Sequence, residues 1–301
     1  MGQLFRAALR VMSTTLAIVS IAVLACGGSG RPPAAPSPPP PAAGPWQLVW
    51  SDEFSEPDGA APDPSRWVFD LGGGGWGNNE LQTYTDRREN SVVRHGILAI
   101  RALKESFAGA DGVRREFTSA RIKTLGRFSQ RYGRFEARLR IPRGQGIWPA
   151  FWMLGHDIER IGWPACGEID VMENIGREPM LVHGTLHGPG YSGAQGIGAS
   201  FPSPQPFAND FHVFAVEWEP QAIRWAVDGT VYQTRMPADL PPGSRWVFDR
   251  PFFLLLNVAV GGNWPGSPDA STSFPQELLV DWVRVHARLG TSQSDSTDSP
   301  R

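Results

Sequence analysis

The sequence predicts an all-β protein, built as a sandwich of two packed antiparallel sheets. Glycine and proline are frequent, with 34 and 28 occurrences in 301 residues, and this favours short strands joined by turns. Several segments alternate apolar and polar residues with a period of two, as a strand with one buried face does. No long stretch has the spacing of an amphipathic helix.

The clearest strand patterns lie in the second half of the chain. Residues 133–141 place apolar side chains on one face and charged ones on the other. Asp228-Gly229 separates two alternating runs and is typical of a two-residue hairpin. Residues 251–260 are almost wholly apolar, which indicates a central strand buried on both faces. The other alternating runs are 211–218, 223–227, 231–234 and 278–287. Many strands with short turns fit a β-jelly-roll sandwich with a concave cleft.

Residues 1–26 are predicted to be an export signal. Arg6 and Arg10 precede an apolar run that ends in small residues, which is the pattern of a signal peptide. The run closes with V-L-A-C, which resembles a bacterial lipoprotein cleavage box, so we expect a lipid anchor on Cys26; ordinary cleavage nearby is the alternative. The protein is therefore expected to be exported, as a cell-surface or periplasmic lipoprotein or otherwise secreted. It would contact a membrane only through Cys26.

Three further segments follow. Residues 27–44 are rich in Pro, Ala and Gly and predict an extended spacer. Residues 45–289 have one continuous composition and are expected to form one domain, whose single cysteine, Cys166, predicts no disulfide. Residues 290–301 are polar and Ser-rich, and a disordered tail is expected there.

Charge and aromatic content limit the partners. The formal net charge of −2 offers no basic cluster for phosphates, so nucleic acid is not an expected partner. The chain has 12 Trp against 4 Tyr. The large flat face of Trp suits stacking on ring-shaped ligands as well as packing in a core.

Three acids stand close together in the run G-E-I-D-V-M-E-N. In a regular strand Glu168 and Asp170 point to one face and Glu173 to the other. A β-bulge at Val171-Met172 would return Glu173 to the first face, and bulges are frequent beside active sites. Three carboxyls on one face repel one another, so at least one of them is expected to have a raised pKa.

Carboxyls that differ in charge suit glycosidic bond cleavage. In the retaining route an ionised carboxylate attacks the anomeric carbon and a protonated carboxyl, about 5–5.5 Å away, protonates the leaving oxygen. Asp170 lies between the two glutamates and can hydrogen-bond Glu168. A Ca²⁺ site or a solvated acidic face is the alternative. Ile169, Val171 and Met172 indicate a central strand, where an unpaired row of acids is too costly to be accidental.

The chain resembles the laminarinase-type members of glycoside hydrolase family 16, which are retaining β-jelly-roll enzymes. The family pattern E-x-D-x-x-E stands here as Glu168, Asp170 and Glu173, and the resemblance implies nucleophile, assisting acid and acid/base in that order. The other matching motifs are S-A-R-I-K-T at 119–124, Y-G-R-F-E-A-R at 132–138, W-P-A-F-W-M-L at 148–154 and N-V-A-V-G-G-N-W-P-G at 257–266. The resemblance implies a family 16 catalytic domain over 45–289.

Substrate-binding groups are expected around the acids. Aromatic side chains cover the apolar faces of sugar rings, and polar ones hydrogen-bond the hydroxyls. Trp148 and Trp152 share a face of an extended segment, as do His183, Thr185 and His187. The resemblance implies a cleft lined by Asn79, Glu80, Trp148, Trp152, Trp163, His187 and Trp264. For each tryptophan, a place in the core is the alternative.

Asp281 marks a second candidate site. Alternation places it with Val283 and Val285 on the apolar side of the last strand, and a buried acid needs a partner. The resemblance implies a structural Ca²⁺ on the convex side, held by Asp281 with oxygens near Glu53 and Gly96. An ion pair between Asp281 and an arginine is the alternative.

The resemblance implies a hydrolase that cleaves internal β-1,3 or mixed β-1,3/1,4 linkages of glucans such as laminarin, by double displacement. No cofactor is expected for catalysis, the partner is a β-glucan polysaccharide, and a monomer is expected. One alternative is a non-catalytic β-glucan-binding module, although such relatives usually lack the acids. Another is a family relative that acts on agarose or carrageenan. The stretch G-G-N-W-P-G at 261–266 favours β-1,3-glucan.

Overall fold

The computed structural model describes residues 45–288. The predicted segments 1–26, 27–44 and 290–301 therefore lie outside the described residues. The first strands are β1 (Trp46–Asp52), β2 (Val68–Asp70), β3 (Gln82–Tyr84), β4 (Ser91–Arg94), β5 (Ile97–Ala108), β6 (Arg114–Ser119), β7 (Arg121–Lys123), β8 (Gly133–Arg140) and β9 (Ile147–Gly155). The later strands are β10 (Glu168–Glu173), β11 (Leu181–His187), β12 (Ile197–Pro202), β13 (His212–Glu219), β14 (Ala222–Val227), β15 (Thr230–Arg235), β16 (Phe252–Val260) and β17 (Gln276–Arg288). Short helices are α1 (Ile158–Ile161), η1 (Gly193–Gln195) and η2 (Pro237–Asp239). Within 45–288, no helix has the length and apolarity needed to cross a membrane.

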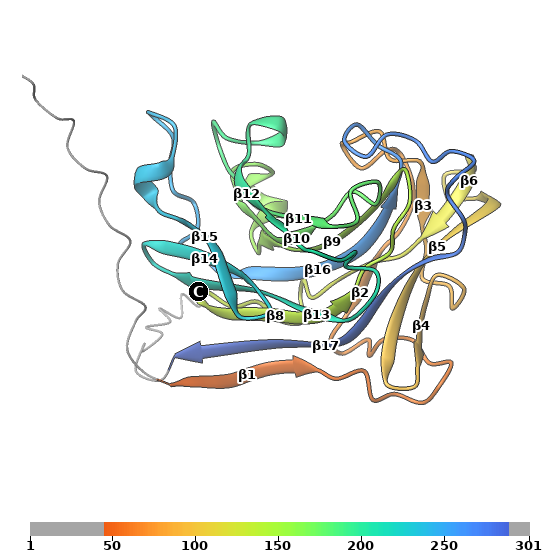
Figure 1. The fold of residues 1–301 in the computed structure, drawn as a ribbon, viewed down its shortest axis with the longest axis horizontal. Coiled ribbons are helices and arrows are strands. Elements are labelled where there is room, and N and C mark those ends of the chain that lie inside the picture. The colour runs from red at the N-terminus through yellow and green to blue at the C-terminus, as the bar shows by residue number, and fades with distance from the viewer. Residues whose placement is uncertain (1–44, 289–301) are drawn as a thin grey trace, which may run out of the picture. The chain divides into compact units, whose positions relative to one another are not determined.

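The strands form two layers, as predicted. The front sheet has the order β12-β11-β10-β9-β16-β7-β2. The back sheet has the order β15-β14-β13-β8-β17-β5-β6-β3, with β1 paired to β17 and β4 paired to β5. Figure 1 shows β9, β10, β11 and β16 lying over β8, β13 and β17. The pairs are antiparallel except for β3 with β6, so the all-β sandwich is confirmed.

The strand patterns of the second half are also confirmed. Along β8, buried residues alternate with half-buried ones up to the exposed last residue. Every residue of β16 is buried, as the apolar run predicts for a central strand. The hairpin between β14 and β15 turns at Asp228 and Gly229, whose φ angles are 48° and 79°. Positive φ at both positions is what a two-residue turn of this kind requires.

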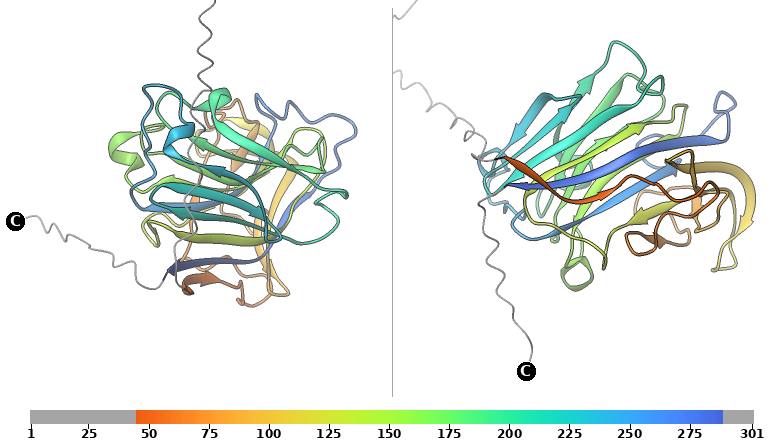
Figure 2. Two further views of the ribbon diagram at one scale, coloured as in Figure 1. Left: turned by 60° about the vertical axis from the view of Figure 1, so that its left-hand side comes forward. Right: turned by 90° about the horizontal axis from the view of Figure 1, so that it is seen from below.

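The core lies between the two sheets. Figure 2 shows the two sheets in two further views, the second of them from below. Trp218 of β13 in the back sheet is fully buried, and so is Phe252 of β16 in the front sheet. Their rings meet edge to face with centroids 5.0 Å apart. Burying a large apolar side chain contributes roughly 1.5–3 kcal/mol, so contacts of this kind hold the layers together.

The expectation for Asp281 is wrong, because β17 is itself irregular. Its register against β8 shifts between Val280 and Trp282. Val280 is fully buried before the shift and Val283 after it, whereas the side chain of Asp281 is 30% exposed. The shift re-phases the alternation that had placed Asp281 on the apolar side.

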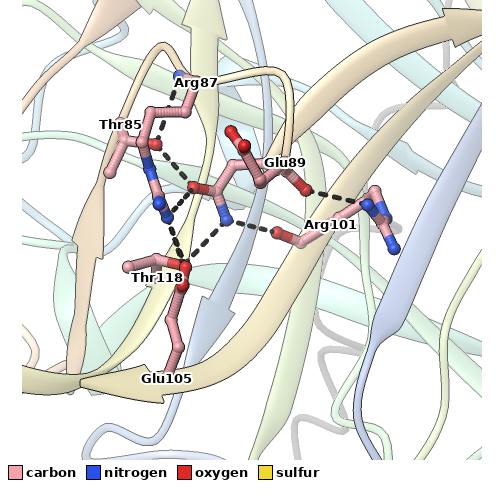
Figure 3. A network of polar contacts seen from close by, with 7 residues as sticks. Thr85, Arg87, Glu89, Arg101, Glu105 and Thr118 are labelled. Atoms are coloured by element: carbon pink, nitrogen blue, oxygen red, sulfur yellow. Dashed lines mark hydrogen bonds and ion pairs between the residues drawn. The ribbon is translucent and has the colours of Figure 1, made fainter. Parts of the chain in front are cut away.

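A polar network fastens the loop before β4 to β5 and β6 (Figure 3). Asn90 is fully buried, and its Nδ2 donates to the carbonyl oxygen of Arg101 at 3.0 Å and to Thr118 Oγ1 at 2.9 Å. Arg87 donates to Asn90 Oδ1 at 3.0 Å and pairs with Glu105. These hydrogen bonds satisfy the buried side chain of Asn90 and hold the loop against β5 and β6.

Candidate active site

The three acids lie on β10, between β9 and β11 in the front sheet. Against β9, Asp170 lies opposite Trp152 and Met172 opposite Phe151. Val171 is therefore the extra residue on β10, and the predicted bulge is confirmed. A bulge of this kind changes which face the following side chains point to.

The bulge returns Glu173 to the face of Glu168. Across the pairing with β11, Glu168 lies opposite His187 and Glu173 lies opposite His183. Both histidines are half-buried, whereas the residues between them on the other face of β11 are fully buried. Since directly paired residues point to the same side of a sheet, both glutamates lie on the outer face of the front sheet. We call this surface, around Glu168, Asp170 and Glu173, the acid face.

An indole from the back sheet supports the bulge. Trp225 on β14 is fully buried, and its Nε1 donates to the carbonyl oxygen of Asp170 at 2.7 Å. A buried carbonyl left without a donor costs about 1–3 kcal/mol. The ladder is irregular at this point, and the indole supplies the donor. The backbone that carries the acids is thus fixed from the other layer.

Glu168 and Asp170 share a small hydrogen-bonded group. Trp163 Nε1 donates to Glu168 Oε2 at 2.5 Å. A hydrogen bond joins the side chains of Glu168 and Asp170. On the other side, His187 Nε2 lies 3.1 Å from Asp170 Oδ2. Asp170 is 2% exposed, so its charge is shielded from water by these neighbours.

Glu173 lies at the other end of the group. Trp148 Nε1 donates to Glu173 Oε1 at 3.0 Å. The Trp148 ring meets the Trp264 ring at right angles, with centroids 5.5 Å apart. Trp264 also contacts the His183 ring, at 4.9 Å and 68°. Each glutamate therefore receives an indole N–H from a different tryptophan.

Burial and mutual repulsion raise the pKa of all three carboxyls. Burial raises the pKa of Glu168 to about 8, and the charge of Asp170 adds to this, while His187 and Trp163 oppose it. Burial raises the pKa of Asp170 to about 7. The pKa of Glu173 is raised well above its usual value by burial, and then by the charges of Asp170 and Glu168. The three carboxyls therefore do not all ionise together near neutral pH, and the group titrates as a unit.

Atoms of Glu168, Asp170 and His187 lie within 4.8 Å of one another. Two carboxylates and an imidazole are ligand types that divalent metals accept. Trp163 already donates to Glu168 Oε2, and a hydrogen bond joins Glu168 to Asp170. The carboxyls of this trio therefore also belong to the acid group.

The loop after β2 brings Asn79 and Glu80 close to the loop after β16. Asn79 Nδ2 donates to Asn263 Oδ1 at 2.8 Å. Glu80 Oε2 accepts from Gln82 Nε2 at 2.6 Å, and burial raises the pKa of Glu80. A Cβ on Gly262 would meet the Glu80 side chain at 3.7 Å. A Cβ there would meet Trp148 at 3.6 Å, so Asn79 and Glu80 adjoin the aromatic end of the acid face.

Trp152 belongs to a second cluster on the same side. Its Nε1 donates to Asn257 Oδ1 at 2.7 Å, and Asn257 Nδ2 lies 3.1 Å from Tyr84 Oη. The guanidinium of Arg121 lies 4.7 Å from the Trp152 ring and 4.9 Å from the Trp76 ring. A cation between two indoles holds both rings in place.

The predicted tryptophans all keep exposed surface. Trp163 is 49% exposed and Trp264 is 36% exposed, while Trp148 and Trp152 are half-buried. The core alternative is therefore wrong for Trp148, Trp163 and Trp264, whereas Trp152 also packs against the smaller buried cluster around Leu154. Two groups were not singled out as site residues from the sequence. They are Arg121 with its neighbour Trp76, where the motif around Arg121 was recognised, and His183, whose shared face with His187 was the available signal.

The expected calcium site does not fit the residues found. Arg138 Nη1 lies 2.5 Å from Asp281 Oδ2. Arg284 forms two hydrogen bonds with Glu53, at 2.9 and 2.8 Å. Each carboxylate already faces a guanidinium, which repels a divalent cation. The arginine pair left open for Asp281 is the arrangement in the structure, and Gly96 takes no part in it.

A β-sandwich with three acids, indoles and polar side chains on one face defines a glycosidase that acts on a polysaccharide. The model of glycosyl hydrolases family 16 matches residues 78–284. A β-glucanase from Rhodothermus marinus is 43% identical over 290 residues, which cover 92% of this chain and 95% of the relative. The laminarinase catalytic domain from Thermotoga maritima is 48% identical with a TM-score of 0.77, over 81% of this chain and 99% of that one. The endo-β-1,3-glucanase from Pyrococcus furiosus is 45% identical with a TM-score of 0.77, over 81% and 95%. The chain belongs to glycosyl hydrolase family 16.

Proposed function

We propose that this chain is a retaining endo-β-1,3-glucanase of the laminarinase type. Glu168 is the nucleophile, Asp170 the assisting acid and Glu173 the acid/base. The observation that carries the proposal is the bulge of β10, which puts both glutamates on one face, each under an indole N–H. The β-glucanase, laminarinase and endo-β-1,3-glucanase relatives support the substrate class.

In the first step Glu173 gives its proton to the glycosidic oxygen as the carboxylate of Glu168 attacks the anomeric carbon. The bond from that carbon to the leaving oxygen breaks, and an ester to Glu168 forms. In the second step Glu173 takes a proton from water, whose oxygen attacks the same carbon. The ester bond then breaks and returns Glu168 as a carboxylate.

The electrostatics of the group assist the change of role. The charge of Glu168 is one cause of the raised pKa of Glu173. When Glu168 is esterified its charge is gone, so the pKa of Glu173 falls and this side chain becomes a better base. Asp170 keeps its hydrogen bond to Glu168 in the resting enzyme and sets how readily that carboxyl ionises.

The other predicted residues are proposed to hold the sugar chain. Trp148, Trp152, Trp163 and Trp264 offer rings, while Asn79, Glu80 and His187 offer polar atoms. Internal β-1,3 linkages are the proposed target, with mixed β-1,3/1,4 glucans as further substrates. A binding module without catalysis is disfavoured, because the three acids are all present and their pKa values are raised.

Export is proposed from the sequence of residues 1–26, with Cys26 as a lipid anchor and residues 27–44 as the spacer to the domain. Under this proposal the enzyme acts outside the cytoplasm. Globomycin treatment of producing cells would leave an unprocessed precursor. Normal processing under that treatment would rule out the lipoprotein form.

The first test is Glu168→Gln. The variant should lose hydrolysis of laminarin by at least about 10³-fold, because no ester can form, and it should keep its fold and its binding of glucan. Glu116→Gln, at an exposed glutamate of β6, is the control. Full activity of Glu168→Gln would reject the proposed roles.

Product analysis tests the rest of the proposal. Early products followed by NMR should have the β-configuration, and release of α-anomers would exclude double displacement. Laminarin should be cleaved into a range of oligosaccharides, which marks internal attack. Lichenan, agarose and carrageenan assayed beside it decide the linkage, and preference for agarose or carrageenan would contradict the glucanase proposal.

A further inference from the structure

His183 has a place in the site that the proposed function does not use. It lies on β11, directly opposite Glu173 across the strand pair, and its side chain points to the acid face. His187 occupies the corresponding place opposite Glu168 and contacts Asp170. The two histidines therefore flank the acids, one at each end.

The contacts of His183 fix its ring. Its Nδ1 is 2.8 Å from Ser200 Oγ on the neighbouring strand β12. One edge packs against Trp264, with ring centroids 4.9 Å apart and planes inclined at 68°. Its Nε2 is buried and makes no hydrogen bond to the described residues. Burial lowers the pKa of His183, so its ring is neutral near pH 7. The neutral ring packs against the Trp264 indole as one aromatic ring against another.

The indole of Trp264 depends on such contacts. The backbone around it is held by the Arg177 side chain, which donates to the Trp264 carbonyl at 3.2 Å and to the Pro265 carbonyl at 2.6 Å. The indole itself is 36% exposed and rests between His183 and Trp148 in two edge-to-face contacts. Trp148 is in turn tied to Glu173. Removing His183 frees one side of the indole while the loop backbone stays anchored.

The geometry of the double displacement indicates which sugar of the substrate contacts the Trp264 indole. In the double displacement the nucleophile and the leaving oxygen lie on opposite sides of the anomeric carbon, and the acid stands beside the leaving oxygen. Glu168 and its neighbours are at one end of the group, and Glu173, Trp148 and Trp264 are at the other. The Glu173 end is therefore the leaving-group side.

We propose that His183 is a positioning residue that holds Trp264 as a platform for the sugar on the leaving-group side of the cleaved bond. The inference rests on the proposed function, since it takes Glu168 as nucleophile and Glu173 as acid. His183 forms no hydrogen bond with the acids in the described part of the chain, and it acts through Trp264. It matters only when a sugar occupies that side.

The experiment compares two substrates. A β-1,3-gluco-oligosaccharide has a sugar as leaving group, whereas 2,4-dinitrophenyl β-laminaribioside has none there and needs little acid assistance. His183→Ala should lower kcat/KM on the oligosaccharide by up to about tenfold, the range of one aromatic pair, and leave the aryl substrate within about twofold. His183→Phe, which keeps an aromatic edge against Trp264, should recover most of the loss.

His212→Ala is the matched control in the back sheet. The His212 ring also has a polar partner, Asp228 at 2.7 Å, and an edge-to-face contact with Phe207 at 5.0 Å. This variant should leave kcat/KM on both substrates unchanged. Thermal midpoints of the His183 and His212 variants show whether each protein is folded at the assay temperature.

A double-mutant cycle tests the route through Trp264. His183→Ala should cost nothing further on the oligosaccharide in a Trp264→Ala background, because its partner is already gone. Equal losses on both substrates, no loss on the oligosaccharide, or additive losses in the cycle would each overturn the inference. A wild-type protein that cleaves neither substrate would instead refute the proposed function.

Discussion

The outer faces of the two sheets both carry carboxylates, but the partners of these carboxylates differ between the acid face and the back sheet. On the back sheet the acids face arginines, as in Arg138 with Asp281 and Arg284 with Glu53. The side chains of these pairs are between 30% and 44% exposed. Arg284 lowers the pKa of Glu53, so that carboxyl stays charged. Glu53 therefore serves as a fixed charge and not as a proton carrier.

On the acid face, Glu168, Asp170 and Glu173 face indoles, an imidazole and one another. Burial with no guanidinium beside them raises the pKa of Glu168 to about 8 and that of Asp170 to about 7. The comparison shows that the same side-chain type becomes a fixed charge or a proton carrier according to its partner and its burial. Three predictions test this contrast, from the largest expected effect to the smallest.

Glu173→Gln should have the largest effect. Loss of the general acid should reduce kcat on laminarin by on the order of 10²–10⁴. Cleavage of 2,4-dinitrophenyl β-laminaribioside should keep its first step and recover turnover with azide, which needs no base, yielding a β-glycosyl azide. Glu136→Gln in the back sheet, where the acid faces Arg134, should leave kcat unchanged. Failure of azide to rescue Glu173→Gln would contradict the acid/base role.

The stability of the fold should fall as pH rises between about 5 and 8. A carboxyl whose folded pKa is raised binds its proton more tightly in the folded state, so its stabilising contribution is present at low pH and is lost as pH rises through the folded pKa, about 8 for Glu168. One group changes the free energy of unfolding by at most about 1.4 kcal/mol per pH unit. Urea unfolding at several pH values measures this, and Glu168→Gln should show a shallower fall than the wild type. An identical slope in the variant would contradict the raised pKa.

Glu53→Gln should have the smallest effect. Its exposed pair with Arg284 should be worth about 0–1 kcal/mol of unfolding free energy, and high salt should reduce it further. Urea unfolding at low and high salt checks this. Stabilisation of the wild type by added Ca²⁺ that Glu53→Gln abolishes would show that the carboxylate serves a metal and would break the contrast between the faces.

The fold and the acid face could be predicted wherever the relevant pattern lies within one continuous segment of the sequence. The strands around Asp228-Gly229 and the run 251–260 follow from residues adjacent in the chain. The bulge at Val171 followed from a conflict within one segment, because the three acids could not otherwise share a face. The sequence reveals a strand that is long enough to show the alternation of apolar and polar residues. It also reveals a break in that alternation when the break would bury an unpaired charge.

The rest depended on registers between distant strands. The irregularity before Trp282 moves Asp281 off the core face. An acid at an apolar position signals a conflict there, but a buried acid with a partner would resolve it as well as a shift of register. The stacking of Arg121 on Trp152 joins β7 to β9, which are separated in the sheet by β16. The support of Asp170 by Trp225 crosses from one layer to the other. Such contacts follow only from the placement of whole sheets.

The hydrogen bond from Trp225 makes catalytic competence a property of the whole sandwich. A small thermal separation of the two sheets would break the hydrogen bond from Trp225 to β10 before any pair of strands separates. We therefore expect activity to be lost on heating as the two sheets begin to separate. The residual activity then reports whether the sheets are still in contact.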